Sequence, residues 1–87
     1  MNNKEYKKLK QNDIIAIQYT KDTPLFALKI TSIRINNFMD LFNCVGVIIY
    51  HPNELYIGCN HSFNTTRYED YYILKKVTKS GLIALII

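Results

Sequence analysis

The sequence predicts an α+β domain that is mainly β, built as a small antiparallel sheet or partial barrel with one or two short helices. Short runs rich in β-branched and aromatic residues alternate with polar or proline-containing breaks. Two of these runs flank His51-Pro52-Asn53-Glu54, a spacing typical of a β-hairpin. Of the 87 residues 48% are apolar, which suffices for one core. We therefore expect a single domain over residues 1–87, in which residues 1–10 form a flexible basic lead.

The first half of the chain predicts two strands and a turn. Residues 13–20 carry β-branched and aromatic side chains between polar breaks, which indicates a strand. Residues 25–35 fit a helix, because Thr23 and Pro24 suit an N-cap followed by proline at the first helical position. They also fit a strand, because they alternate and are rich in β-branched residues, and we favour the strand. Residues 36–42 predict a turn or a single helical turn with apolar side chains pointing inward.

The second half predicts a central hairpin of Cys44–Tyr50 and Leu55–Cys59, followed by a loop over residues 60–66. Residues 71–77 fit a helix, opened by a capping box at 66–69, or a strand. In the second case the strand pairs with Leu82–Ile87 across a turn at 78–81. Because Leu82–Ile87 is apolar on both faces, we expect it to be an interior strand, and we favour this second hairpin.

Charge and composition limit the classes of function. Eleven basic and seven acidic residues give a net charge of +4, which attracts phosphates weakly and is not a nucleic-acid-binding signature. No apolar run is long enough to cross a bilayer, and the N-terminus lacks the apolar stretch of a secretory signal. Two cysteines are too few for a disulfide scaffold, so we expect reduced thiols, a cytoplasmic location and no membrane insertion.

The candidates for catalysis or metal binding are two cysteines and two histidines. Cys59 and His61 lie two residues apart and form the pattern of a thiolate activated by imidazole. His51 and Cys44 would complete a set of zinc ligands. We favour ordinary structural roles for all four, since no C-x-x-C pair is present. We therefore expect no enzymatic activity from this chain alone, no metal site and no cofactor.

The candidate binding residues are tyrosines interleaved with basic side chains. Five of the seven tyrosines fall between residues 50 and 72. Aromatic rings beside cations stack bases and neutralise phosphates in single-strand binders, whereas tyrosine is also a common strand residue with an apolar body and a polar tip. The candidate binding residues are Tyr50, Tyr56, Arg67, Tyr68 and Tyr72.

The segment from about Leu9 to Val77 resembles the circularly permuted branch of the NlpC-type papain-like superfamily. Residues 9–15 are similar to its opening "L-x-x-G-D-I-I" strand, and residues 42–49 to the stretch "H-V-G-I" that supplies its catalytic histidine. Here Asn12 stands in the place of the glycine and Cys44 in the place of the histidine. The family's nucleophilic cysteine lies on a helix after the last strand, which has no counterpart in these residues. The resemblance thus implies a degenerate or truncated member with a binding or structural role.

The chain also resembles PUA-like and ASCH barrels, small RNA-associated domains. Residues 12–15 are similar to their "G-D-I-I" entry, residues 28–33 to their middle strand, and residues 71–86 to their ending. The "G-x-K" substrate loop of these domains has no counterpart here. This second resemblance implies binding to RNA or single-stranded nucleic acid.

These observations predict a small non-catalytic binding or interaction module, with a protein partner or a homo-oligomer. One alternative is a PUA-like nucleic-acid-binding domain, and another is a thiol-dependent hydrolase that uses Cys59 and His61. Self-association is expected because Leu82–Ile87 has no charge or proline to protect it at a sheet edge.

Overall fold

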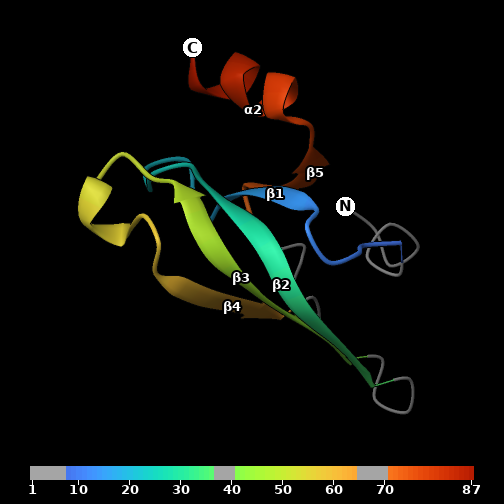
Figure 1. Cartoon of the computed structure of the whole chain (residues 1–87). Helices are drawn as coiled ribbons and strands as arrows, with labels where there is room; N and C mark the ends of the chain where they lie inside the picture. Colours follow the sequence, from blue (N-terminus) through green and yellow to red (C-terminus); the bar gives the residue numbers. More distant parts are fainter. Residues whose placement is uncertain (1–7, 37–40, 65–70) are drawn as a thin grey trace.

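The computed structural model describes residues 8–36, 41–64 and 71–87, and these residues form a five-stranded antiparallel sheet and one short α-helix (Figure 1). The sheet order is β4-β3-β2-β1-β5. This architecture confirms the predicted fold class. The strands are β1 (Ile14–Gln18), β2 (Phe26–Asn36), β3 (Leu41–Tyr50), β4 (Asn60–Asn64) and β5 (Ile73–Val77), and the helix is α2 (Lys79–Ile86).

Both ambiguous segments are strands. β2 extends over residues 26–36, so the β-branched alternation there outweighs the helix-start chemistry of Thr23 and Pro24. Thr23 instead closes a turn, in which its Oγ1 accepts a hydrogen bond from the backbone N–H of Thr20 at 2.9 Å. β5 extends over residues 73–77 and pairs with β1. The proposed capping box at residues 66–69 and most of the proposed turn at 36–42 lie outside the described residues.

The predicted central hairpin is wrong in its second strand. β3 pairs with β4 at residues 60–64, whereas residues 54–56 form the short 3₁₀-helix η1 (Glu54–Tyr56). Of the predicted strand Leu55–Cys59, Gly58 and Cys59 hydrogen bond to the backbone of Ile48 in β3. Asn53 caps η1 by accepting a hydrogen bond from the N–H of Leu55. Gly58 then reverses the chain at a φ of +90°, a conformation that glycine adopts without strain. The expected loop over residues 60–66 is therefore a strand in its first five residues, and β2 rather than this hairpin lies at the centre of the sheet.

The predicted interior strand Leu82–Ile87 is also wrong, because these residues belong to α2 and the segment that follows it. Thr78 starts the helix, since its Oγ1 accepts a hydrogen bond from the N–H of Gly81 at 3.0 Å. The sequence Thr78-Lys79-Ser80-Gly81 thus forms an N-cap and a first helical turn in place of a hairpin turn. α2 stands beyond the end of the sheet, next to β5 (Figure 1).

The sheet curls around one hydrophobic core. Ile15, Ile17, Leu28 and Ile30 from the central strands are fully buried in this core. The two edge strands contribute to the same cluster, β4 through Phe63 and β5 through Leu74. The Tyr19 hydroxyl, directly after β1, lies 2.6 Å from His61 Nε2 on β4, although β2 and β3 separate the two strands in the sheet. The sheet is therefore strongly twisted and coiled, and the partial barrel is the better description of the two that the sequence predicted.

A β-bulge at Thr31 changes which side chains of β2 face the core. Ile30 pairs with Gly46, whereas Ser32 pairs with Val45, so β2 has one extra residue here. Thr31 Oγ1 donates a hydrogen bond to the carbonyl of Val45 at 3.1 Å. Before the bulge the even-numbered residues face the core, and after it Ile33 packs against the core. Ser32 and Arg34 are exposed as a result.

The residues before β1 are tied to the sheet. Leu9 is buried in the core, and the backbone N–H of Lys10 donates to Asp13 Oδ2 at 2.9 Å. Asn12 has a φ of +76°, and its N–H donates to the carbonyl of Ile30 at 2.8 Å. Asparagine tolerates this left-handed conformation better than most residues with a Cβ. Residues 1–7 of the expected basic lead lie outside the described part of the chain.

Candidate functional site

One end of the curled sheet carries a cluster of aromatic rings. Tyr19, which follows β1, lies 5.3 Å from Tyr71 and 5.8 Å from Phe26, measured between ring centroids. Phe26 in turn meets His61 of β4 edge to face at 5.2 Å, and His51 at 5.8 Å. These contacts bring together the β1–β2 connection, the β3–β4 connection and the start of β5, so the cluster closes one end of the partial barrel.

A hydrogen bond between Tyr19 and His61 lies within this cluster. The Tyr19 hydroxyl and His61 Nε2 are 2.6 Å apart. Burial lowers the pKa of His61, and burial together with the neighbouring Tyr71 raises the pKa of Tyr19. Both shifts favour the neutral forms at pH 7. A neutral imidazole that carries its proton on Nδ1 accepts the hydroxyl proton at Nε2, so the pair forms a structural contact across the barrel.

Cys59 and His61, the residues of the thiol hypothesis, make separate contacts. His61 Nε2 contacts Tyr19, whereas the Cys59 thiol donates to the carbonyl of Leu55 at 3.7 Å. Cys44 is fully buried between β2 and β4, and burial raises its pKa to about 12, which keeps the thiol protonated. His51 Nδ1 accepts a hydrogen bond from the backbone N–H of Asn53 at 2.9 Å. Within residues 8–36, 41–64 and 71–87, no three His, Cys, Asp or Glu side chains lie close enough together to hold a metal ion.

The predicted tyrosine site is only partly placed. Tyr56 on η1 is half exposed, and its ring lies 4.7 Å from that of His51, at the margin of the aromatic cluster. Tyr72 is 58% exposed, and its backbone N–H donates to the carbonyl of Tyr19. Tyr50 ends β3 opposite Ala27. Arg67 and Tyr68 lie outside the described residues. Sequence reasoning missed Tyr19, Phe26 and Tyr71, which join Tyr56 and the two histidines in the cluster.

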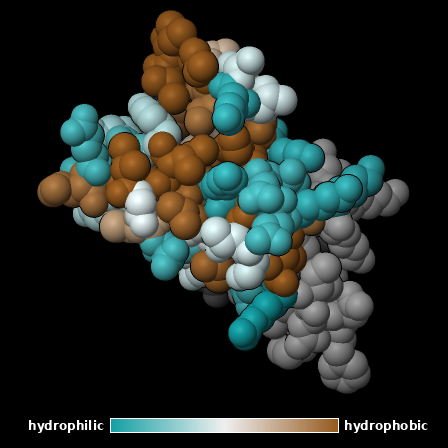
Figure 2. Space-filling view, in the orientation of Figure 1, coloured by the Kyte–Doolittle hydropathy of each residue, from teal (hydrophilic) through white to brown (hydrophobic). Residues whose placement is uncertain are grey.

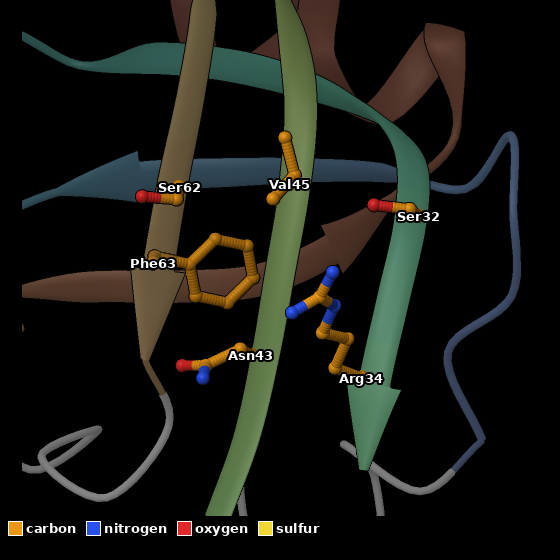
Figure 3. Close-up of a pocket in the computed structure, with 6 residues that line it drawn as sticks. All are labelled: Ser32, Arg34, Asn43, Val45, Ser62 and Phe63. Atoms are coloured by element: carbon orange, nitrogen blue, oxygen red, sulfur yellow. The ribbon is translucent and has the colours of Figure 1, made fainter.

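A polar pocket lies on β2, β3 and β4, with a volume of about 400 Å³. Arg34 and Asn43 are cross-strand partners on β2 and β3, and Ser32, Val45 and Ser62 form a row across all three strands. Figure 3 shows the guanidinium of Arg34 turned from β2 toward β3, between Asn43 and Val45. The pocket is lined by Ser32, Arg34, Asn43, Val45, Ser62 and Phe63. Sequence reasoning missed this pocket, because the bulge that exposes Ser32 and Arg34 was not recognised in the sequence.

A hydrophobic surface extends over α2. Of the helix residues only Leu82 is buried, while Ile83 is 57% exposed and Ile87, directly after the helix, is 97% exposed. Figure 2 shows hydrophobic residues of α2 at the top of the molecule, with a second hydrophobic group below them over the end of the sheet. In the part of the chain that the structure describes, no helix has both the length and the apolar character needed to span a bilayer.

No protein-family model, curated protein or solved structure matches the chain. The resemblances to the NlpC-type superfamily and to PUA-like barrels therefore stay predictions. Three described features bear on function: the aromatic cluster, the polar pocket and the exposed surface of α2. The aromatic cluster joins elements of the fold. The polar pocket and the surface of α2 face solvent and are available to a ligand or a partner.

Proposed function

We propose that this chain is a non-catalytic protein-interaction module that associates through α2. The supporting observation is that α2 is apolar on every side from Leu82 to Ile86 but buries only Leu82. A helix with apolar residues on every side is normally enclosed by other protein. Ile83, Ile86 and Ile87 instead face solvent. Exposed apolar groups of this kind mark interaction surfaces in folded proteins.

The occupant of this surface in the proposal is a second copy of the chain. Each molecule carries a net charge of +4, so two copies repel one another over most of their surfaces. From Ser80 to Ile87 there is no charged side chain. Contact through residues 82–87 therefore brings two apolar surfaces together without opposing like charges in the contact. A two-fold axis makes such a surface complementary to itself.

Light scattering across a tenfold dilution tests the proposal. The wild-type protein is expected to show a mass above that of the monomer at high concentration, which falls on dilution. Ile83→Lys should shift the protein toward monomer and leave its fold intact, because Ile83 is exposed. Leu55→Lys is the matched control, since Leu55 is 84% exposed on η1 and should not alter the mass.

Two outcomes would contradict the proposal. A strictly monomeric wild-type protein at high concentration removes self-association through α2. Equal effects of Ile83→Lys and Leu55→Lys would show that association is a general property of exposed apolar groups and not of this helix. Circular dichroism of both variants establishes that each is folded before the masses are compared.

A further inference from the structure

We infer that the pocket on β2, β3 and β4 binds the phosphate of a phosphate ester, with Arg34 as its charged anchor. The inference uses no residue of α2, so it stands or fails separately from the proposed self-association. It depends on how the bulge exposes polar side chains, on the lack of an acidic partner for Arg34 among the described residues and on the width of the pocket.

The bulge at Thr31 creates the pocket. Without the extra residue, Ser32 and Arg34 would continue the core-facing alternation of Leu28 and Ile30. With it, both polar side chains face outward beside β3. Bulges that redirect side chains are common next to binding sites. The hydrogen bond from Thr31 Oγ1 to the carbonyl of Val45 holds this geometry in place.

Arg34 provides a cation with no acidic partner among the described residues. The carboxylates of the described part, Asp13, Asp22 and Glu54, are absent from the lining of the pocket. Asp13 is paired with Lys76 at 3.4 Å. Around the guanidinium lie Asn43, whose amide donates hydrogen bonds, and the hydroxyl of Ser32. A guanidinium with neutral donors beside it suits the oxygen atoms of a phosphate.

The width of the pocket indicates a ligand larger than a free phosphate ion. Ser32 and Ser62 are separated by β3, and two strand spacings amount to about 10 Å. One phosphate group does not reach both. A phosphate held by Arg34 and Asn43 places the rest of the ester over half-buried Val45, toward the hydroxyl of Ser62. Nucleotides have this combination of a phosphate, a partly apolar body and further polar groups.

Two sources supply such a phosphate, a free mononucleotide and a nucleic-acid strand, and Lys29 distinguishes them. Lys29 is an exposed residue of β2 on the other side of the bulge, where it pairs with Val47, and it is not part of the pocket lining. It is available to a second phosphate of a longer strand but not to the single phosphate held by Arg34. Loss of Lys29 should therefore weaken binding of a strand and spare binding of a mononucleotide.

The test is an NMR titration of the ¹⁵N-labelled protein at low salt with adenosine 5′-monophosphate, adenosine and a short single-stranded oligonucleotide. A phosphate ester should shift the amide signals of Ser32, Arg34, Asn43 and Ser62, and adenosine without phosphate should not. Arg34→Gln should weaken binding about tenfold, as expected for the loss of a charge-assisted hydrogen bond. Lys75→Gln is the control, because it removes the same charge from an exposed position of β5 and should leave affinity within about twofold.

The titrations distinguish a mononucleotide site from a site for a nucleic-acid strand. Binding of both phosphate ligands with equal affinity, insensitive to Lys29→Gln, assigns the site to a mononucleotide. Tighter binding of the oligonucleotide, with steep salt dependence and sensitivity to Lys29→Gln, assigns it to a nucleic-acid strand. Adenosine binding as tightly as the monophosphate, equal effects of Arg34→Gln and Lys75→Gln, or no Arg34-dependent binding of either phosphate ligand would each overturn the inference.

Discussion

The Tyr19 hydroxyl lies 2.6 Å from His61 Nε2, although 42 residues separate them in sequence and β2 and β3 lie between their strands in the sheet. A flat sheet would hold β1 and β4 about 14 Å apart, three strand spacings. The contact therefore depends on the curl of the sheet and joins the two sides of the partial barrel. It ties the ionisation of one histidine to the stability of the fold.

Acidification is expected to destabilise the protein through His61. Its folded-state pKa lies below the value of about 6.5 in the unfolded chain, so the unfolded state takes up the proton first. The stabilising contribution is complete above about pH 6.5 and is lost as the pH falls toward and through the folded-state pKa. Urea unfolding measured between pH 7.5 and pH 5 should show this decline. In His61→Gln the free energy of unfolding should fall less steeply over this pH range. An unchanged pH dependence would show that other groups cause the decline.

Tyr19→Phe should lower the free energy of unfolding by about 1 kcal/mol, the usual net value of one hydrogen bond. The substitution keeps the ring contacts with Phe26 and Tyr71 and removes only the hydroxyl that meets His61. Tyr72→Phe is the matched control, because Tyr72 is largely exposed, and it should change stability by less than about 0.5 kcal/mol. Equal losses in the two variants, measured by urea denaturation, would contradict a role for the hydrogen bond.

The two cysteines should differ in reactivity toward iodoacetamide. Cys59 is exposed and should be alkylated in the native protein, whereas Cys44 is fully buried with a pKa raised to about 12. Intact mass spectrometry at pH 8 should show one modification in the native state and two in urea. Cys59→Ser is expected to abolish the native-state modification. Rapid native labelling of Cys44 would show that β3 opens readily.

Gly46→Ala should destabilise the sheet by about 1–3 kcal/mol, the range for overpacking a buried site. A Cβ at residue 46 would lie 2.6 Å from the backbone carbonyl oxygen of Lys29 and 3.3 Å from the Cβ of Leu28. Neither neighbour is the end of a flexible side chain, so β2 and β3 would have to separate. Thermal unfolding measures the effect, and a variant with wild-type stability would show that the strands approach less closely than described.

Asn12 provides a paired test of backbone conformation. At a φ of +76°, alanine is expected to cost about 1 kcal/mol, because its Cβ is strained in the left-handed region and it lacks the local hydrogen bonding of asparagine. Glycine adopts this φ without strain, which favours the folded state of Asn12→Gly. It also raises the entropy of the unfolded chain, which offsets part of that gain. If Asn12→Ala and Asn12→Gly have the same stability, the positive φ contributes no strain.

Sequence patterns predicted the strands at residues 14–18 and 26–36, whose side chains are rich in β-branched residues. The strand at residues 73–77 was expected as the partner of Leu82–Ile87, whereas it pairs with β1. β4 was missed because Asn60, His61 and Ser62 are polar, and strands are recognised chiefly by apolar residues. α2 was taken for a strand because a short apolar run has no period that separates a buried strand from a helix. Its helical signal was Thr78 at the N-cap, which competed with the turn character of Ser80 and Gly81.

The functional features were predictable only where they depend on single residues. Tyr56 and Tyr72 are exposed, and their role as binding residues stays a prediction. The pair Tyr19–His61 and the polar pocket depend on the curl of the sheet and on the bulge at Thr31, and both are tertiary properties. The bulge left one trace in the sequence: within residues 28–35 the apolar positions change from even numbers, Leu28 and Ile30, to odd numbers, Ile33 and Ile35.

The strand order has a consequence for how the chain assembles. β1 to β4 form a meander in which each strand pairs with the one before it, whereas β5 returns past all of them to pair with β1. Contacts between sequence neighbours close small loops, and the β1–β5 contact closes the largest one at a higher entropic cost. We therefore expect β5 to join last and to detach first. Since α2 follows β5 directly, a partner that encloses α2 would also hold β5 in place, and binding and the completion of folding would be one event.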